Sequence, residues 1–352
     1  MKILNLTTHR ETYRVEVKHS ILFETALGIA AYTYYDFHHT LEKPLEYWEG
    51  ITKKISEELK EELQHVHVHN TWYAILQLLH YSKEETMEGF LDFLSQLSLE
   101  QCCFYCLPYL GRENEELRQR VATGDQEASR QLMKKCEEHK FFPTYISYIG
   151  NVNMIDLKKH MAAVFVGWYK EVVGPIQQEW LAILERDAAQ KRSVQAHYSP
   201  EKFVEYATKG IAYQPEPFVD RVLLIPQYIY RPWNVEASLP GTKVFYYPVS
   251  DESVHLSEDL YAPPSILVHG YKALGDETRL RIVKLLSERD YSLQELHEKL
   301  SIPKSTLHHH LSLLRSARLV TNTSSKYELN RENVSSLQKW FTHFLERRTN
   351  EE

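Results

Sequence analysis

The stretch Ser305–Val320, STLHHHLSLLRSARLV, decides how this chain is interpreted. Leu307, Leu311 and Leu314 recur at intervals of three and four residues, which predicts an amphipathic helix with these leucines on its buried face. Three histidines in a row, residues 308–310, stand on the same helix. Consecutive residues of a helix point about 100° apart, so three neighbouring histidines do not share one metal ion.

The flanking segments predict a helix-turn-helix with a wing. SLQELHEKL begins with Ser292 and Glu295, the spacing of a capping box that opens a helix. Residues 301–303, Ser-Ile-Pro, form a three-residue turn, and two short helices joined by such a turn are typical of a helix-turn-helix. Downstream, LVTNTSSKYELN predicts two short strands around residues 322–325, which would form the wing.

Further elements complete a small C-terminal module. ILVHGYKALG predicts a short helix ending at Gly275, and Asp276 can cap the next helix, ETRLRIVKLLSE. A last helix is expected at about residues 331–346. One side of it carries more apolar surface than a lone exposed helix should show, at Val334, Leu337, Phe341, Phe344 and Leu345.

In this order and at these spacings, the segments resemble the winged helix-turn-helix of the ArsR family of bacterial regulators. The resemblance covers roughly residues 267–345. It implies a homodimeric transcriptional regulator, expected to be a repressor, that binds double-stranded operator DNA. It also implies that the recognition helix enters the major groove. The first and last helices would pair the subunits, with the five apolar residues above at the dimer interface.

The resemblance also assigns the residues that contact DNA. Carried over position by position, they are Ser305, Thr306, His308, His309 and His310 on the recognition helix. Lys304 and Arg315 are expected to contact phosphates, and Lys326 is the only base of the wing. Two alternatives stay open: Ser305 and Thr306 could simply cap the helix, and His310 could pack under the wing.

The module departs from the family pattern at three places. Arg318 stands where the family has a glycine before the wing, and the usual arginine of the wing is missing. His308 and His309 replace the common Ser and Arg. Fewer fixed cations imply weaker phosphate contact, or DNA binding that depends on pH.

The length of 352 residues predicts two or more domains. We expect a mainly α protein with minor β: a mostly helical N-terminal domain over residues 1–250, a linker at 251–265, and the winged helix-turn-helix at 266–352. TYRVEV predicts a strand near the start. Two segments before the linker predict a β-hairpin, and Pro226, Pro232 and Pro248 within them favour edge strands. The segments, RVLLIPQYIYRPWNVE and TKVFYYPV, also resemble the end of a helical domain of uncharacterised function found ahead of ArsR modules.

Charge and composition separate the two parts. From residue 265 onward there are 14 Lys and Arg against 11 Asp and Glu, and the remainder carries 27 against 37. A locally basic module can bind nucleic acid even when the rest of the chain is acidic. Twenty of the 23 tyrosines and five of the six tryptophans precede residue 265. A helical body this aromatic can hold a pocket for a small organic effector.

Two clusters raise the alternative of a metal or thiol sensor. HVHVHN puts His65, His67 and His69 on one side if the stretch is extended, but a polar linker between two helices is favoured. Cys103 and Cys106 form one CxxC pair beside Cys102, but a structural zinc site needs a second pair of ligands, and Cys136 stands alone. Buried, inert thiols are therefore favoured over zinc ligands. His343 and Glu346 have metal-ligand spacing without the rest of a site. No metal or cofactor is expected.

Other function classes find little support. The longest strongly apolar run, Met161–Tyr169, is too short to span a bilayer, and the first residues lack a secretory signal, so a soluble cytoplasmic protein is expected. Common catalytic and nucleotide-binding motifs are missing, and we expect no enzyme activity. An enzyme or metabolite-binding domain fused to a DNA-binding module remains the alternative.

Overall fold

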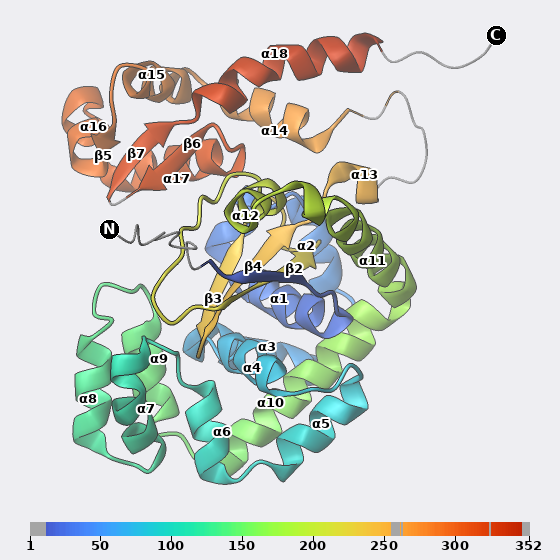
Figure 1. Ribbon diagram of the computed structural model, residues 1–352, viewed down its shortest axis with the longest axis vertical. Coiled ribbons are helices and arrows are strands. Elements are labelled where there is room, and N and C mark those ends of the chain that lie inside the picture. The colour runs from blue at the N-terminus through green and yellow to red at the C-terminus, as the bar shows by residue number, and fades with distance from the viewer. Residues whose placement is uncertain (1–11, 255–260, 262, 324, 347–352) are drawn as a thin grey trace, which may run out of the picture. The chain divides into compact units, whose positions relative to one another are not determined.

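The computed structural model describes residues 12–254, 261, 263–323 and 325–346, and its contacts divide the chain into two units (Figure 1). The N-terminal unit holds the described residues of 1–38 and 43–249, and the C-terminal unit holds those of 39–42 and 250–352. Within the predicted linker, Asp251–Val254 form the short helix α13. Residues 255–260 and 262 of that linker lie outside the described residues. The chain is mainly α with minor β, as predicted.

The N-terminal unit consists mostly of helices. The α-helices are α1 (Ile21–Thr33), α2 (Leu45–Thr52), α3 (Glu57–His69), α4 (Trp72–Tyr81), α5 (Met87–Gln96), α6 (Leu99–Cys106), α7 (Glu115–Ala122), α8 (Gln126–Lys134), α9 (Phe142–Ile149), α10 (Met154–Trp168), α11 (Gln177–Val194) and α12 (Pro200–Thr208). Shorter helical turns are η1 (Tyr35–Thr40), η2 (Arg112–Asn114), η3 (Tyr169–Val173), η4 (Gly174–Ile176) and η5 (Gln195–His197).

Helix α1 is the centre of this unit. All of its residues are buried, because α3, α4, α10 and α11 and the sheet surround it (Figure 1). Ser20 begins the helix by accepting a hydrogen bond from the Leu22 N–H (3.2 Å). Gly28 lets α10 approach, since a Cβ at this position would lie 2.7 Å from Nε1 of Trp168. This apolar helix therefore serves as the core helix of the unit.

A four-stranded sheet covers one side of α1. Its strands are β1 (Arg14–Val17), β2 (Arg221–Gln227), β3 (Val235–Leu239) and β4 (Thr242–Pro248), in the order β1-β2-β4-β3. The predicted first strand and the hairpin between β3 and β4 are confirmed, but β1, β2 and β4 run parallel. Val222 and Leu224 pack with α11 and α12 on one face, while Tyr246 contacts Phe23 of α1 on the other. Burial on both faces explains the continuous apolar runs.

The expectation that prolines mark edge strands is wrong for Pro226 in β2 and Pro248 in β4, because these are the two central strands of the sheet, and Pro232 lies outside the strands. The pairing explains how Pro226 is tolerated. Strand β1 pairs with β2 only as far as Leu224, so at Pro226 the strand has β4 as its one neighbour. A proline in a strand lacks the N–H that a second neighbour would need.

A buried carboxylate holds the loop that follows β2. Glu24 of α1 accepts hydrogen bonds from the N–H groups of Tyr228 (3.0 and 3.1 Å) and Ile229 (2.6 Å). Burial raises the pKa of this carboxyl to about 7, although the backbone donors and Lys43 oppose the shift. Glu24 thus anchors the loop at the end of the central strand.

The C-terminal unit is a small module of helices and short strands. It contains α14 (Ser265–Leu274), α15 (Glu277–Leu286), β5 (Tyr291–Ser292), α16 (Leu293–Leu300), α17 (Lys304–Ser316), β6 (Val320–Thr323), β7 (Lys326–Leu329) and α18 (Arg331–Glu346). The strands form an antiparallel sheet in the order β5-β7-β6. Leu307, Leu311 and Leu314 are buried in its core, with residues of α15, α16 and the sheet around them. The predicted helices, turn and wing are therefore confirmed, with Ser324 of the wing outside the described residues.

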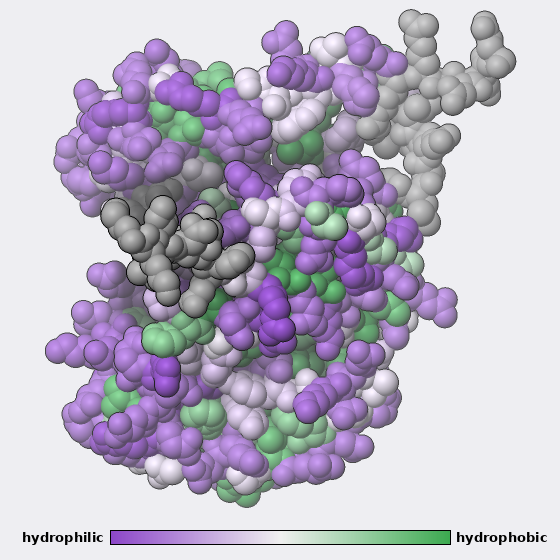
Figure 2. All heavy atoms as spheres, in the orientation of Figure 1, coloured by the Kyte–Doolittle hydropathy of each residue, from purple (hydrophilic) through white to green (hydrophobic). Residues whose placement is uncertain are grey.

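Hydrophilic residues dominate the face shown in Figure 2, and hydrophobic residues show mainly between them. No helix in the described ranges is long and apolar enough to cross a membrane.

Candidate nucleic-acid interface

The turn between α16 and α17 is fixed by local hydrogen bonds. Ser292 and Glu295 form the predicted capping box: the Ser292 hydroxyl accepts from the Glu295 N–H (3.3 Å), and the Glu295 carboxylate accepts from the Ser292 N–H (2.8 Å). This hydrogen bond, with help from Arg289, lowers the pKa of Glu295 to about 2. Helix α16 ends at Ser301 in the left-handed conformation, with a φ of 56°. Nδ1 of His297 donates to the Ile302 carbonyl (2.7 Å) and closes the turn.

The first turn of α17 presents free donors to solvent. Lys304, Ser305 and Thr306 are exposed, and the residue that precedes the helix, Pro303, makes no side-chain cap. Within the described part of the chain, the hydroxyl and N–H groups of Ser305 and Thr306 have no hydrogen-bond partner. The alternative that these two residues cap the helix is therefore wrong. Free N–H groups at a helix N-terminus form a ready site for phosphate oxygens.

The three histidines of α17 have different surroundings. His309 is exposed and His308 is half-buried. His310 points inward: its side chain is 14% exposed, and Nδ1 lies 3.7 Å from Oδ1 of Asp276, the residue that caps α15. Burial lowers the pKa of His310, while Asp276 opposes that shift. His310 therefore lies beside the start of α15, so the expectation that it packs under the wing is corrected, while its contact with DNA stays a prediction.

Arg315 is less available for phosphate contact than the sequence suggested. It is half-buried near Tyr327 of β7, and burial lowers the pKa of its guanidinium. Lys326, at the start of β7, is exposed as predicted for a wing cation. The exposed basic groups that this interface offers among the predicted residues are therefore Lys304 and Lys326.

Arg318, which stands where the resembled family has a glycine before the wing, has an unusual backbone conformation. Arg318 has a φ of 58°, a conformation that glycine adopts without steric cost and other residues avoid. The Arg318 N–H donates to the Arg315 carbonyl (2.8 Å), and the Arg318 carbonyl accepts from Nδ2 of Asn333 (3.0 Å). These bonds hold the strained turn between α17 and β6.

Helix α18 contributes side chains both to the core of the module and to its surface. Leu337 is buried against α14, where a Cβ at Gly270 would overlap Cδ2 of Leu337. Its assignment to a dimer interface is therefore corrected: Leu337 fills the gap that Gly270 leaves. Val334 also packs against the core, and Phe344 is half-buried. Phe341 and Leu345 remain on the surface, 40% and 63% exposed.

The other two candidate clusters lie in the N-terminal unit. The three histidines of HVHVHN lie in α3, which ends at His69, so the predicted linker is wrong. Nε2 of His65 is hydrogen-bonded to the Tyr148 hydroxyl (2.7 Å), Nδ1 of His67 donates to the Thr33 carbonyl (2.8 Å), and His69 stacks on Tyr148. Among the described residues, no group of three or more His, Cys, Asp or Glu side chains could hold a metal ion.

The cysteines are free thiols. The predicted burial of Cys102, Cys103 and Cys106 is confirmed. Burial raises the pKa of Cys103 to about 12, while a hydrogen bond with Cys106 lowers the pKa of Cys102. Thiols that are buried in this way have little access to a metal or an oxidant.

Sequence reasoning missed how α14 and α15 are joined. Nε of Arg279 donates to the Ala273 carbonyl (2.5 Å), and Nη2 donates to the Lys272 carbonyl (3.0 Å). Arg279 thus satisfies carbonyl groups at the end of α14. The one available signal was an arginine three residues after the capping Asp276.

Comparisons with known proteins agree with this geometry. Residues 276–322 match the family described as "Bacterial regulatory protein, arsR family". The C-terminal unit is an ArsR-type helix-turn-helix module. It is similar to the HTH-type transcriptional regulator KmtR of Mycobacterium tuberculosis, with 34% identity over 76 residues. That match covers 20% of this chain and 58% of KmtR.

A second relative is the transcriptional repressor SdpR of Bacillus subtilis. The ArsR-type module is 27% identical to it over 85 residues, which cover 23% of this chain and 94% of SdpR. No solved structure matches the chain.

Proposed function

We propose that the chain is a transcriptional regulator whose ArsR-type module binds operator DNA as a homodimer. The observation that carries this proposal is the first turn of α17. Its exposed N–H and hydroxyl groups at Ser305 and Thr306, next to Lys304, are suited to a DNA phosphate. The buried leucines of the same helix hold it rigidly, so that His309 can reach base edges in the major groove.

Further aspects of the proposal rest on separate observations. Repression is proposed because SdpR is named a repressor. Dimerisation is proposed because Phe341 and Leu345 leave apolar surface on α18. The N-terminal unit is proposed to bind a small organic effector without catalysing a reaction.

The test begins by selecting bound sequences from a random DNA pool with the full chain. Affinity for the selected site is then measured by fluorescence anisotropy at several salt concentrations. We expect a slope equivalent to about three to five released counterions per dimer. Lys304→Gln should reduce this slope by about two per dimer, one for each half-site. Lys339→Gln is the matched control, since Lys339 is an exposed lysine on α18.

Two outcomes would contradict the proposal. Selection could enrich no sequence, or binding to the selected site could be independent of salt.

A further inference from the structure

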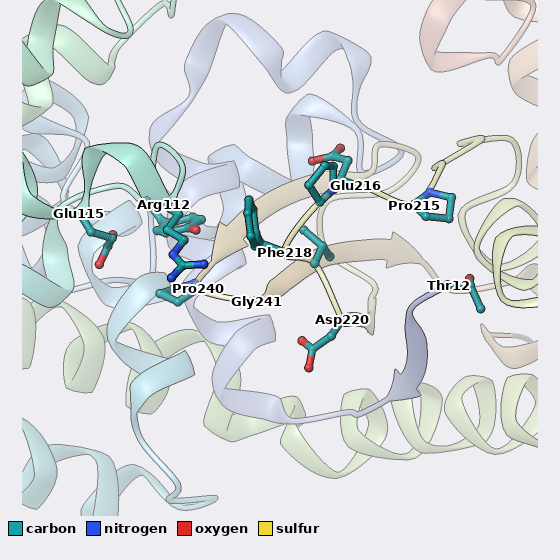
Figure 3. Close-up of a pocket in the computed structure, with 12 residues that line it drawn as sticks. Thr12, Arg112, Glu115, Pro215, Glu216, Phe218, Asp220, Pro240 and Gly241 are labelled. Carbon is teal, nitrogen blue, oxygen red and sulfur yellow. The ribbon is translucent and has the colours of Figure 1, made fainter. Parts of the chain in front are cut away.

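The N-terminal unit has a surface cavity that the proposed DNA contacts do not use. Its volume is about 1000 Å³, at the upper end of the range for small-molecule sites. Four separate segments line it (Figure 3): Thr12 before β1, the region from Tyr109 to Glu115, the turn at residues 215–220, and Pro240-Gly241 between β3 and β4.

Phe218 is the most unusual residue of the cavity. Its side chain is 69% exposed, which is high for a phenylalanine, and its φ is 67°. A left-handed conformation is sterically unfavourable for a bulky residue, so the turn holds this ring in place against a local preference. Exposed aromatic rings held in this way are suited to stacking against a ligand.

Arg112 provides a positive charge beside that ring. Its guanidinium lies 5.0 Å from the Phe218 ring centroid (Figure 3). In the described part of the chain it makes no hydrogen bond or ion pair. A guanidinium stacked on a ring keeps its N–H edge free, and that edge matches the two oxygens of a carboxylate.

Asp220 provides a negative charge in the same cavity. A Cβ at Gly241 would lie 3.1 Å from Oδ1 of Asp220, so the glycine makes room for this carboxylate. Asp220 is exposed, its backbone is hydrogen-bonded to Arg14 and Gly241, and its carboxylate has no hydrogen bond or ion pair among the described residues. By contrast, Glu115 is already bound to Arg118 (3.0 Å). Glu216 adds a further carboxylate near the Tyr213 hydroxyl.

We infer that this cavity binds a small zwitterion of the amino-acid or short-peptide class. The carboxylate of the ligand would pair with Arg112, its ammonium with Asp220, and an apolar side chain would lie on Phe218. A simple anion would be repelled by Asp220 and Glu216, and a simple cation by Arg112, so a ligand with both charges fits best. That this ligand is also the effector of the regulator rests on the proposed function, whereas its binding in the cavity does not.

The test is isothermal titration calorimetry of the full chain with three probes. They are the tripeptide alanyl-phenylalanyl-alanine, its C-terminal amide and its N-acetylated form. The free tripeptide should bind, and each modification should weaken binding at least tenfold, because it removes one charge-assisted contact. Arg112→Gln should abolish the discrimination against the amide, and Asp220→Asn should abolish the discrimination against the acetylated form.

Matched controls are Arg130→Gln and Asp156→Asn, exposed charges on α8 and α10 outside the cavity. Since Arg112 and Asp220 are exposed as well, all four variants should keep the circular dichroism spectrum of the parent. The inference is overturned if the tripeptide gives no heat at millimolar concentration. It is also overturned if the three probes bind equally, or if the amide alone binds, which would indicate a site for organic cations.

Anisotropy on the selected DNA, with and without the tripeptide, separates this inference from the proposed function. Loss of DNA binding by the full chain would contradict the proposed function and leave the calorimetric result unaffected. A tripeptide that binds and shifts DNA affinity supports both.

Discussion

At the scale of single residues, Arg318 shows how a departure from a family pattern appears in backbone geometry. It occupies a left-handed conformation where the resembled family has glycine. Arg318→Gly should relieve steric strain, and Arg318→Ala should remove the same side chain while keeping the strained Cβ. We therefore expect the glycine variant to be more stable than the alanine variant by about 1 kcal/mol, as measured by urea unfolding.

Because both variants lack the arginine side chain, its contacts do not affect the difference in stability between them. Equal stability, or a more stable alanine variant, would mean that the turn before the wing relaxes without cost.

The raised pKa of Glu24 predicts that the stability of the N-terminal unit depends on pH. Burial raises the pKa of its carboxyl in the fold from 4.5 to about 7. Since the folded state binds this proton more tightly than the unfolded chain, the contribution of Glu24 is fully present below pH 4.5 and is lost as pH rises toward 7. A shift of this size corresponds to about 3 kcal/mol. Glu24→Gln should remove this dependence, because the amide does not titrate.

The measurement is denaturant unfolding of the parent and the Glu24→Gln variant between pH 4.5 and 8. The difference between the two proteins is the informative quantity, since other titrating groups, such as His80 with its burial-lowered pKa, contribute to both. A difference that stays constant with pH would show that Glu24 is ionised throughout this range.

At the scale of elements, substitutions in helix α17 can show which of its histidines contact DNA and which stabilise the fold. His308→Ala and His309→Ala should each weaken binding to the selected DNA by roughly 1–3 kcal/mol. Non-specific binding should change much less. His310→Ala should instead lower thermal stability, because His310 packs beside Asp276.

His343→Ala provides the control, as an exposed histidine on α18. Anisotropy on specific and random DNA, together with thermal unfolding, distinguishes the variants. If His309→Ala binds specific DNA as tightly as the parent, α17 does not read DNA through this histidine.

The elements that sequence predicted well are those fixed by neighbouring residues. The capping box of α16, the cap of α15 and the limits of α18 depend on local hydrogen bonds and periodicity. HVHVHN was misassigned because an alternating pattern can also be a helix, in which Val66 is buried. The partner of His310 lies 34 residues away in Asp276, and no local pattern points to it.

At the scale of the whole molecule, the sequence predicted that an aromatic body could hold a pocket but not where. The cavity explains the difficulty, since its lining comes from four segments spread between residues 12 and 241. Arg112 and Asp220 meet there only through the tertiary fold. The parallel pairing of β1 with β2 was missed for the same reason, because these strands are about two hundred residues apart in the chain.

The last prediction concerns assembly. Phe341 is 40% exposed on α18 and lies 5.7 Å, centroid to centroid, from Tyr271 of α14, which is also exposed. Together with Leu345 they leave an apolar surface on the two helices that the resemblance assigns to subunit pairing. Phe341→Glu would place a charge on this surface, which should break the dimer at micromolar concentration and reduce affinity for the selected DNA at least tenfold.

Leu280→Glu is the matched control, since Leu280 of α15 is an apolar side chain with similar exposure outside α14 and α18. Sedimentation velocity of the full chain gives the oligomeric state, and anisotropy gives DNA affinity. Because Leu337 and Gly270 hold α18 in place from the inside, the variant should keep its fold. A Phe341→Glu protein that still sediments as a dimer would place the interface elsewhere in the chain. A parent protein that sediments as a monomer would instead contradict binding as a preformed homodimer.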